Sequence, residues 1–486
     1  MTEHPHAQHW IGGTWVGSAS SRQNSIDPAT GAVIGTYDDG GAEEAQAAIE
    51  AATAAFGASV WRYDAMMRSA ALGHLADAFE ARLDEVIDTL CLENGKLRYE
   101  AAFEAGFIAR GLRFAAGLAV QNHGRVTETR PGQQSMSIRQ PIGVAGLIIP
   151  WNSPAYLCIR ALAPALAAGC TAVIKMPHQA AQTAALAGEI FSSVPELGGG
   201  IVNVFIESGA DGARLLVDSP QVPVVNFTGS TRTGRQIAQA AAVHLKRVGL
   251  ELGGKTPHLV FDDADLEAVL PTLEKSSTIF AGQFCMTGSR ILVQRTIADK
   301  VRDGLAARLT NVRPGPAADP ASDMGPLIDK ASVARVNAIV EDAIEAGATV
   351  VVRGGPSTDP ALSGGAFYHP TLLEVTDSSL PIVQQETFGP VQTLQIFDTE
   401  DEAVALANDS EYGLSACIWS RDIDTPGRVA RKLDAGLISI NSWANLAVES
   451  EEGGFKSSGL GRLGGAASLD DFLEYKQITQ DFSPAR

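Results

Sequence analysis

Positive charge is scarce in this chain of 486 residues. Lysine and arginine together number 37, against 56 aspartates and glutamates, which gives a formal net charge of −19. Nucleic acids and anionic membrane surfaces attract clustered basic side chains. The balance of charge therefore argues against both as main partners, and we expect no nucleic acid and no membrane among them.

Cysteine is also scarce, and its spacing excludes two common structural roles. The chain has five cysteines, and no two of them form a Cys-x-x-Cys pair. Such scattered residues favour neither a disulfide framework nor a structural zinc site. We expect a reducing compartment and no bound metal.

Targeting and membrane-spanning patterns are missing as well. The first residues, MTEHPHAQHWIGGTW, contain neither the basic stretch nor the apolar stretch of a secretory signal. No apolar run reaches the length of a membrane span without a glycine, a proline or a charge. The expected location is the cytoplasm.

The length and the hydrophobic pattern indicate more than one α/β domain. A chain of 486 residues exceeds one ordinary core, so two or three domains are expected. Apolar residues at helical spacing predict helices over residues 42–56 and 65–95, in a mostly helical segment that ends near residue 127. Short apolar runs alternate with helical stretches over residues 143–260, and again over residues 256–454. This alternation predicts parallel, doubly wound sheets, which bind ligands at the carboxyl ends of their strands.

Two short polar segments fit neither alternating region. Residues 125–141 alternate in character around a Pro-Gly turn, which predicts a hairpin, and the C-terminal DFLEYKQITQDF is strand-like. Exposed strand edges readily pair with another chain. We expect these segments to form a small β element used for oligomerisation.

The segment NFTGSTRTG, residues 226–234, has the character of a phosphate-binding turn. An apolar run ends in a Gly/Ser/Thr turn and a helix follows, so backbone N–H groups and the helix dipole could hold a phosphate. The spacing differs from Gly-x-Gly-x-x-Gly. A plain N-capped helix explains the segment about equally well.

Three side chains suit a nucleophilic active site, although each has an ordinary alternative. Asn152 in GLIIPWNSP could stabilise an oxyanion or simply cap a helix. Glu251 in LELGGKTP could act as a general base or form a salt bridge. Cys285 in FAGQFCMTGSR could be a nucleophile or a small buried hydrophobe. For each residue taken singly, the ordinary alternative is favoured.

Taken together, these segments resemble the aldehyde dehydrogenase superfamily, whose members oxidise aldehydes to carboxylic acids with NAD(P). The resemblance runs over nearly the whole chain and rests on PWNSP, FTGSTRTG, LELGGK, GQFC, ETFGPV and GGFKSSGLGR, in the family's order. It implies an α/β fold with two doubly wound Rossmann-like domains and a small β oligomerisation element. The cofactor-binding domain would comprise residues 1–124 and 142–253, the catalytic domain residues 254–457, and the oligomerisation element residues 125–141 and 466–486.

The resemblance also implies roles for individual residues. Cys285 matches the nucleophile, Glu251 the general base, and Asn152 the oxyanion donor that acts with the backbone N–H of Cys285. Hydride transfer to the cofactor would leave a thioester on the cysteine, which water then hydrolyses. The residues expected to bind NAD or NADP are Trp151, Lys175, His178, Gly209, Thr228, Gly229, Ser230, Gly234, Glu386 and Phe388.

One departure from the family concerns the cofactor. His178, in KMPH, replaces the glutamate that commonly holds both hydroxyls of the adenosine ribose. That glutamate favours NAD because it repels a 2′-phosphate. The expected cofactor is therefore NAD or NADP, with NAD slightly favoured.

Other departures concern the substrate pocket, for which we expect Arg160, Phe284, Met286, Trp443 and Glu452. Arg160 stands where the family often has a bulky aromatic residue, and it lies either in the substrate funnel or on the solvent side of its helix. Glu452 replaces a common aromatic residue of the tunnel, and Phe280 replaces a common asparagine.

These residues leave three classes of aldehyde open. Arg160 suits a semialdehyde with a carboxylate. The glutamates around residue 452 suit a cationic aminoaldehyde, and Phe284 with Trp443 suits an aromatic or aliphatic aldehyde.

Two rival functions deserve comparison with aldehyde oxidation. A CoA-acylating aldehyde dehydrogenase transfers the acyl group to a thiol, and such enzymes tend to lack the glutamate base, so Glu251 argues against it. A non-catalytic binding protein on the same fold is disfavoured by the intact Cys285, Glu251 and Asn152. The expected partners are a small-molecule aldehyde and further copies of the chain, as a homodimer or homotetramer.

Overall fold

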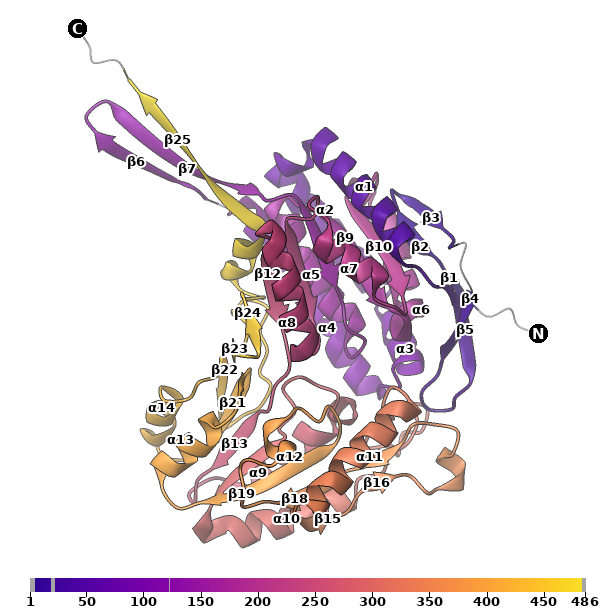
Figure 1. Cartoon of the computed structure of the whole chain (residues 1–486), viewed down its shortest axis with the longest axis vertical. Coiled ribbons are helices and arrows are strands. Elements are labelled where there is room, and N and C mark those ends of the chain that lie inside the picture. Colours follow the sequence, from indigo (N-terminus) through magenta and orange to yellow (C-terminus); the bar gives the residue numbers. More distant parts are fainter. Residues whose placement is uncertain (1–4, 19–21, 122, 483–486) are drawn as a thin grey trace.

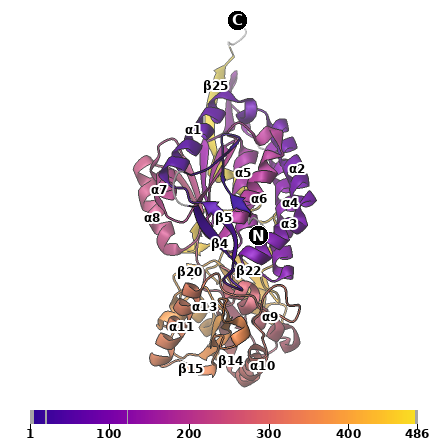
Figure 2. The ribbon, with the colours of Figure 1, turned by 90° about the vertical axis from the view of Figure 1, so that its right-hand side faces the viewer.

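The computed structural model describes residues 5–18, 22–121 and 123–482 (Figure 1). Two α/β lobes are stacked along the long axis, and a narrow β-sheet projects from the first of them (Figures 1 and 2). Each lobe contains a largely parallel sheet between layers of helices. The α/β fold class predicted from the alternating pattern is confirmed.

The first lobe is built on an eight-stranded sheet with the order β24-β12-β11-β8-β9-β10-β2-β3. Its five central strands are parallel, and their side chains are almost all buried, as expected for a sheet covered on both faces. Strand order reverses between β8 and β11, which makes this the switch point of the sheet. The strands are β2 (His9–Ile11), β3 (Thr14–Val16), β8 (Val144–Ile148), β9 (Thr171–Pro177), β10 (Val202–Glu207), β11 (Val224–Thr228), β12 (Arg247–Glu251) and β24 (Gly459–Leu460).

Eight helices cover this sheet. One apolar core joins one face to α2 (Ala65–Ala81), α3 (Leu83–Glu93), α4 (Arg98–Val120), α5 (Pro154–Ala168) and α6 (Ala181–Ser192). A second core joins the other face to α1 (Ala42–Ala58), α7 (Asp211–Asp218) and α8 (Thr231–Ala241).

The first segment of the chain differs in two ways from the expectation of continuous helix. The pattern over residues 65–95 is interrupted at Arg82, whose backbone leaves helical geometry (φ −114°, ψ 21°) and separates α2 from α3. Short strands also precede the helices. Besides β2 and β3 they are β1 (His6–Ala7), β4 (Arg22–Ile26) and β5 (Val33–Asp38), which form a three-stranded sheet of their own.

The second lobe contains a seven-stranded sheet with the order β15-β18-β19-β14-β13-β21-β22, antiparallel only at β15. Its strands are β13 (Pro257–Val260), β14 (Arg290–Gln294), β15 (Thr349–Val352), β18 (Thr371–Glu374), β19 (Val391–Phe397), β21 (Ser415–Trp419) and β22 (Leu437–Ile440). Its helices are α9 (Leu266–Thr278), α10 (Ala298–Thr310), α11 (Lys330–Glu345), α12 (Pro381–Gln384), α13 (Glu400–Asn408) and α14 (Thr425–Ala430).

Short elements complete the chain between these layers. Two-stranded pairs are formed by β16 (Gly355–Pro356) with β17 (Tyr368–His369) and by β20 (Tyr412–Gly413) with β23 (Phe455–Lys456). The 3-10 turns are η1 (Val60–Arg62), η2 (His178–Ala180), η3 (Pro195–Leu197), η4 (Ala242–His244), η5 (Ile279–Gly282), η6 (Arg295–Ile297), η7 (Pro360–Leu362) and η8 (Ala466–Phe472).

The projecting sheet consists of the predicted hairpin and the C-terminal strand. β6 (Arg125–Arg130) and β7 (Gln133–Pro141) form the hairpin, and β25 (Leu473–Asp481) pairs antiparallel with β7 along its whole length (Figure 1). The outermost residues of the expected domain spans, 1–4 and 483–486, lie outside the described residues. In the part of the chain that the structure describes, no helix combines the length and apolarity needed to cross a membrane.

Candidate active site

The parallel strands of the first sheet bring the predicted residues to one edge. Asn152 follows β8, and Thr228 and Glu251 are the last residues of β11 and β12, where they pair in register. Lys175 lies near the end of β9. Because the carboxyl ends of parallel strands share one edge of a sheet, and because β8 and β11 flank its switch point, these side chains surround the expected ligand crevice.

Asn152 contacts the loop that carries Cys285. Its buried Nδ2 donates a hydrogen bond to the carbonyl oxygen of Gln283 at 3.1 Å. Ser153, not Asn152, is the N-cap residue of α5. The interpretation of Asn152 as a helix cap is therefore wrong for this structure, and its amide is directed at the loop instead.

The loop before Cys285 has an unusual backbone. Phe280, Ala281 and Gly282 all have left-handed φ angles of 51°, 52° and 72°, which non-glycine residues adopt at a cost. Glu100 of α4 stabilises this turn, because its Oε1 accepts the Phe280 N–H at 2.7 Å. The Phe280 ring also packs under Lys96 Nζ at 4.2 Å from the ring centre. The departure from the family at residue 280 thus lies in a turn held from the neighbouring lobe.

Cys285 lies in an apolar cluster with the predicted pocket residues. Phe284 and Met286 are buried, whereas Cys285 is half-buried. Trp443 packs edge-on against Phe284 with ring centres 5.8 Å apart, and its Nε1 donates to the carbonyl oxygen of Met286 at 2.9 Å. Desolvation, followed by the effect of nearby carboxylates, raises the pKa of the Cys285 thiol to about 12. The thiol of this structure is therefore protonated at neutral pH.

Glu251 is a buried carboxyl without an ion-pair partner among the described residues. Its Oε1 also finds no hydrogen-bond partner there. Desolvation raises its pKa to about 8, and the opposing charge of Arg160 only partly offsets this effect. The salt-bridged alternative does not apply, and a carboxyl that titrates near neutral pH suits a general base.

Arg160 and Glu452 form a buried ion pair, and each is only 8% exposed. Arg160 Nη1 lies 2.7 Å from Glu452 Oε1, and Nη2 donates to Thr228 Oγ1 at 3.2 Å. The alternative that placed Arg160 on the solvent side of its helix is wrong, because this face of α5 packs against the loop around residue 452.

Three aromatic residues that the sequence reasoning missed form a row of contacting rings, and Tyr156, at one end of this row, lies near the ion pair. Phe103 and Phe107 are one turn apart on α4, with ring centres 5.2 Å from each other, and Phe107 lies 5.3 Å from Tyr156 of α5. Glu452 and Arg160 both influence the pKa of Tyr156, which burial raises. The spacing of two phenylalanines by four residues was the available signal in the sequence.

Ser230 caps the helix that follows the FTGST turn. Its Oγ accepts the Thr233 N–H at 3.3 Å, as the plain-cap alternative requires. Both glycines of the motif have steric reasons to be there. A Cβ on Gly229 would lie 2.4 Å from the Phe227 ring, and one on Gly234 would lie 2.4 Å from Leu252. Gly234 thus lets α8 approach the sheet closely, while the exposed Ser230 marks a helix N-terminus open to an anion.

The other residues expected at the adenosine end lie on neighbouring strand ends. Lys175 and His178 are half-buried, and Gly209 is exposed between β10 and α7. Desolvation and the charge of Lys175 lower the pKa of His178, so its imidazole is neutral at pH 7. His178 also lines a cleft of about 510 Å³ between the lobes, opposite Asp329.

Glu386 and Phe388 of the second lobe contact Gly254 and Trp151, respectively. Glu386 Oε1 accepts the Gly254 N–H at 3.2 Å, and desolvation raises the pKa of Glu386 to about 7. The Phe388 ring lies edge-on to Trp151, 5.5 Å away. A Cβ on Gly253 would lie 2.6 Å from Glu386 Oε2, and one on Gly254 would lie 2.4 Å from the carbonyl oxygen of Cys285. Because Gly253 and Gly254 have no side chains, the Glu386 carboxylate and the Cys285 backbone can lie against them.

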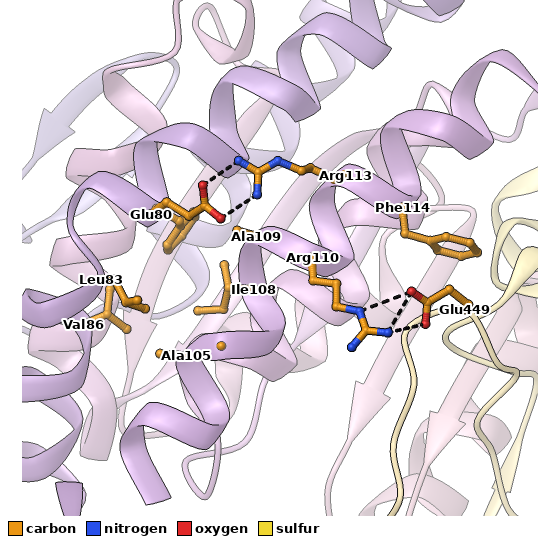
Figure 3. A pocket seen from close by; sticks show the side chains of 12 residues that line it. Glu80, Leu83, Val86, Ala105, Ile108, Ala109, Arg110, Arg113, Phe114 and Glu449 are labelled. Atoms are coloured by element: carbon orange, nitrogen blue, oxygen red, sulfur yellow. Dashed lines mark hydrogen bonds and ion pairs between the residues drawn. The ribbon is translucent and has the colours of Figure 1, made fainter. Parts of the chain in front are cut away.

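A separate pocket of about 450 Å³ lies between α2, α3 and α4 (Figure 3). Apolar side chains form its floor, and the ion pairs Arg113–Glu80 and Arg110–Glu449 stand at its rim. None of the predicted site residues lines it. The pocket is connected to the site only through Glu449, which belongs to the same loop as Glu452.

Comparison with known proteins gives matches along almost the whole chain. The model of the aldehyde dehydrogenase family matches residues 15–478. Betaine aldehyde dehydrogenase of Bacillus subtilis (strain 168) is 35% identical and covers 98% of both chains. Vanillin dehydrogenase of Pseudomonas fluorescens is 37% identical over 94% of both. A crystal structure of betaine aldehyde dehydrogenase from Staphylococcus aureus in complex with NAD+ has 34% identity and a TM-score of 0.96, and it covers 99% of this chain and 96% of the other.

Proposed function

Because the chain belongs to the aldehyde dehydrogenase family, and therefore oxidises an aldehyde to a carboxylic acid with NAD or NADP, we propose that Cys285, Glu251 and Asn152 carry out its chemistry. The observation that carries this assignment is the position of Glu251. Its unpartnered, buried carboxyl belongs to the same edge of the sheet as Asn152, whose amide contacts the Cys285 loop.

Acylation begins when the Cys285 thiol gives up its proton to water and the resulting thiolate attacks the aldehyde carbon to form a C–S bond. The carbonyl oxygen becomes an oxyanion. Asn152 Nδ2 keeps a second N–H besides the one given to Gln283, and this N–H acts with the backbone N–H of Cys285 on the oxyanion. The nicotinamide of the cofactor supplies the hydride acceptor in this chemistry. Loss of hydride leaves a thioester on Cys285.

Deacylation depends on Glu251. Its carboxylate takes a proton from water while the water oxygen attacks the thioester carbon. The C–S bond then breaks, the Cys285 thiolate leaves, and the carboxylic acid is released. A CoA-acylating enzyme would need no such base, so the poised carboxyl favours hydrolysis.

The residues present fit a dinucleotide. Helix α8 presents a capped N-terminus with an exposed Ser230, and Gly253 leaves room for the Glu386 carboxylate. We propose that Lys175 and His178 hold the adenosine ribose with Gly209 nearby, that Thr228, Gly229 and Ser230 hold the pyrophosphate with Gly234 seating their helix, and that Glu386, Phe388 and Trp151 hold the nicotinamide end.

Preference between the two cofactors follows from His178. A neutral imidazole has no charge with which to repel a 2′-phosphate. Several solved relatives are complexes with NAD+, whereas one curated relative is the NADP(+) succinate-semialdehyde dehydrogenase GabD of Escherichia coli (strain K12). We favour NAD, with NADP accepted. Steady-state kinetics with each cofactor test this, and strict use of NADP would reject it.

For the substrate we favour an uncharged aromatic or aliphatic aldehyde. The charge of Arg160 is already neutralised by Glu452, and the remaining proposed walls are Phe284, Met286 and Trp443. Neither the Arg160 guanidinium nor the Glu452 carboxylate is therefore free to pair with the carboxylate of a semialdehyde or with a cationic aminoaldehyde. A panel of all three classes, run with each cofactor, tests the choice.

Three further assignments belong to the same proposal. The domain division is that expected from the sequence, with 1–124 and 142–253, 254–457, and 125–141 with 466–486 as its parts. The projecting sheet joins copies of the chain into a homodimer or homotetramer, because β6 and β25 each leave an edge unpaired within the described chain. The expected location is the cytoplasm.

The decisive experiment is Cys285→Ala. This variant should lose aldehyde oxidation and keep cofactor affinity, measured by calorimetric titration. Cofactor binding without turnover of any aldehyde by the wild type would instead support the non-catalytic alternative.

A further inference from the structure

We propose that the buried Arg160–Glu452 pair is a charge-balancing device that keeps Glu251 able to accept a proton at neutral pH. Both would then be positioning residues, since they act through Glu251 and not on the reacting atoms. The inference rests on the proposed role of Glu251 as general base.

A hydrogen bond and the strand register connect the pair to Glu251. Arg160 Nη2 donates to Thr228 Oγ1 at 3.2 Å, and Thr228 is the register partner of Glu251 in the neighbouring strand. Glu452 is fixed through its backbone, since its N–H and C=O both bond to Leu463, with N···O distances of 2.6 and 2.8 Å. The Arg160 guanidinium cannot turn away without breaking its bonds to Thr228 and Glu452, and the backbone bonds of Glu452 fix the point from which its side chain reaches Arg160.

Burial makes the ion pair costly in free energy, and a function that depends on its two charges would explain why it is present. Removing two charges from water carries a large desolvation penalty, and apolar residues of similar size often stabilise a fold equally well. Burial alone lowers the pKa of Arg160, but the charges of Glu452 and Glu251 outweigh it and raise the pKa overall. The guanidinium therefore stays charged, and its Nε has no partner among the described residues.

Charged side chains from several elements act on Glu251, and Glu251 in turn adds to the effect of desolvation in raising the pKa of the Cys285 thiol. Arg160 on α5 favours its ionised form most strongly, Glu452 opposes this, and Arg462 and Asp471 follow with opposite signs. Glu452 thus offsets part of the support that Arg160 gives to the ionised form of Glu251. Removal of one member should therefore shift the titration of Glu251 in a direction set by the charge that remains.

This reasoning predicts opposite signs for the two members. In Glu452→Gln the uncompensated Arg160 should stabilise the Glu251 carboxylate, so hydrolysis should begin at lower pH. In Arg160→Met the carboxylate loses that support, so hydrolysis should begin at higher pH. Each shift should be about one pH unit, the lower end of what one neighbouring charge produces. A purely structural role would impair both variants without opposite shifts.

The test uses p-nitrophenyl acetate, which needs no cofactor. The Cys285 thiolate displaces p-nitrophenolate from the ester carbon in an initial burst, and the acetyl thioester is then hydrolysed while Glu251 takes a proton from water. The steady rate after the burst, recorded from pH 5.5 to 10 with the background of Cys285→Ala subtracted, gives the midpoint of the hydrolysis step.

A matched control lies three residues away on the same loop. Glu449 pairs with Arg110 of α4 through an exposed bidentate contact, with N···O distances from 2.9 to 3.2 Å (Figure 3). Glu449→Gln removes one carboxylate from this loop, as Glu452→Gln does, but the lost charge is exposed and remote from Glu251. Its hydrolysis midpoint should equal that of the wild type. An equal shift in both variants would overturn the proposal and indicate a loop effect.

Two further variants guard against misfolding. Arg160→Lys keeps a positive charge but loses the two-pronged contact, so its midpoint should lie between those of the wild type and Arg160→Met. The double variant R160M/E452L leaves no orphaned charge, and its midpoint should lie between those of the single variants. Midpoints that move in the same direction, or do not move in folded single variants, would refute the inference. Unchanged hydrolysis in Glu251→Gln would instead refute the role of Glu251, a separate outcome.

Discussion

The turn that delivers Cys285 depends on a carboxylate from the other lobe, and Glu100→Gln tests this dependence. Glu100 is fully buried, with Oε1 bound to the Phe280 N–H at 2.7 Å and Oε2 bound to the Leu97 N–H at 2.9 Å. A glutamine offers one acceptor oxygen in place of two. One of the two backbone N–H groups must then face an amide NH₂ and lose its partner.

The expected magnitude follows from these two contacts. Leaving a buried N–H unsatisfied costs about 1–3 kcal/mol. We therefore expect Glu100→Gln to lower the free energy of unfolding by about 2 kcal/mol. Phe280 and Ala281 keep left-handed backbones at a cost of about 1 kcal/mol each, so the turn should relax once the bond is gone. A shift of the loop should lower kcat about tenfold, equivalent to about 1.4 kcal/mol.

Denaturant unfolding and steady-state kinetics at saturating cofactor measure the two effects. Glu93→Gln is the matched control, since Glu93 is another buried carboxylate that accepts two backbone N–H groups, from Gln182 and Thr183. It should lose similar stability but keep kcat within about twofold. If Glu100→Gln also kept its kcat while losing stability, the turn would be held by other contacts and the reasoning would be refuted.

Three other outcomes are expected. Gly254→Ala should lower kcat by more than about tenfold, because its Cβ would lie 2.4 Å from the carbonyl oxygen of Cys285, whereas Gly57→Ala, in open space on α1, should be neutral in the same kinetic assay. With the pKa of Glu251 near 8 and its carboxylate as the active form, the wild-type rate of thioester hydrolysis should rise about fivefold from pH 7 to pH 8, and a flat profile in single-turnover measurements would contradict the assignment. Deletion of residues 473–486 should yield smaller particles in sedimentation velocity than the full chain does, because β7 loses its nine-residue partner, and an unchanged sedimentation coefficient would count against the projecting sheet as the assembly element.

The fold was readable from the sequence where elements were long and regularly patterned. The strands of the two parallel sheets appear as apolar runs, and residues 125–141 form the expected hairpin. The N-terminal strands escaped notice because they have only two to six residues, too few to show a period of two. The break at Arg82 was not predicted because the apolar spacing continues across it, so the hydrophobic pattern does not reveal the turn.

For the site, the sequence allowed predictions only of residues that belong to local motifs. Motif order located Asn152, Glu251 and Cys285, whose roles stay predictions. The contacts that tune them join distant residues, such as Glu100 with Phe280, 180 positions apart, and Arg160 with Glu452, 292 positions apart. No spacing rule connects such pairs, because only the packing of α4 and α5 against the second lobe brings them together.

The two glycines after Leu252 have a mechanical consequence. They lie in the short segment between β12 of the first sheet and β13 of the second, so the chain crosses between the lobes there. Glu251 precedes this crossing and the Cys285 backbone rests against it. If one lobe rotated about this segment, its far end would move a long way. Glu251 and Cys285, which lie next to the segment, would move least. Base and nucleophile would thus keep their alignment while the cleft between the lobes widened or narrowed around a dinucleotide.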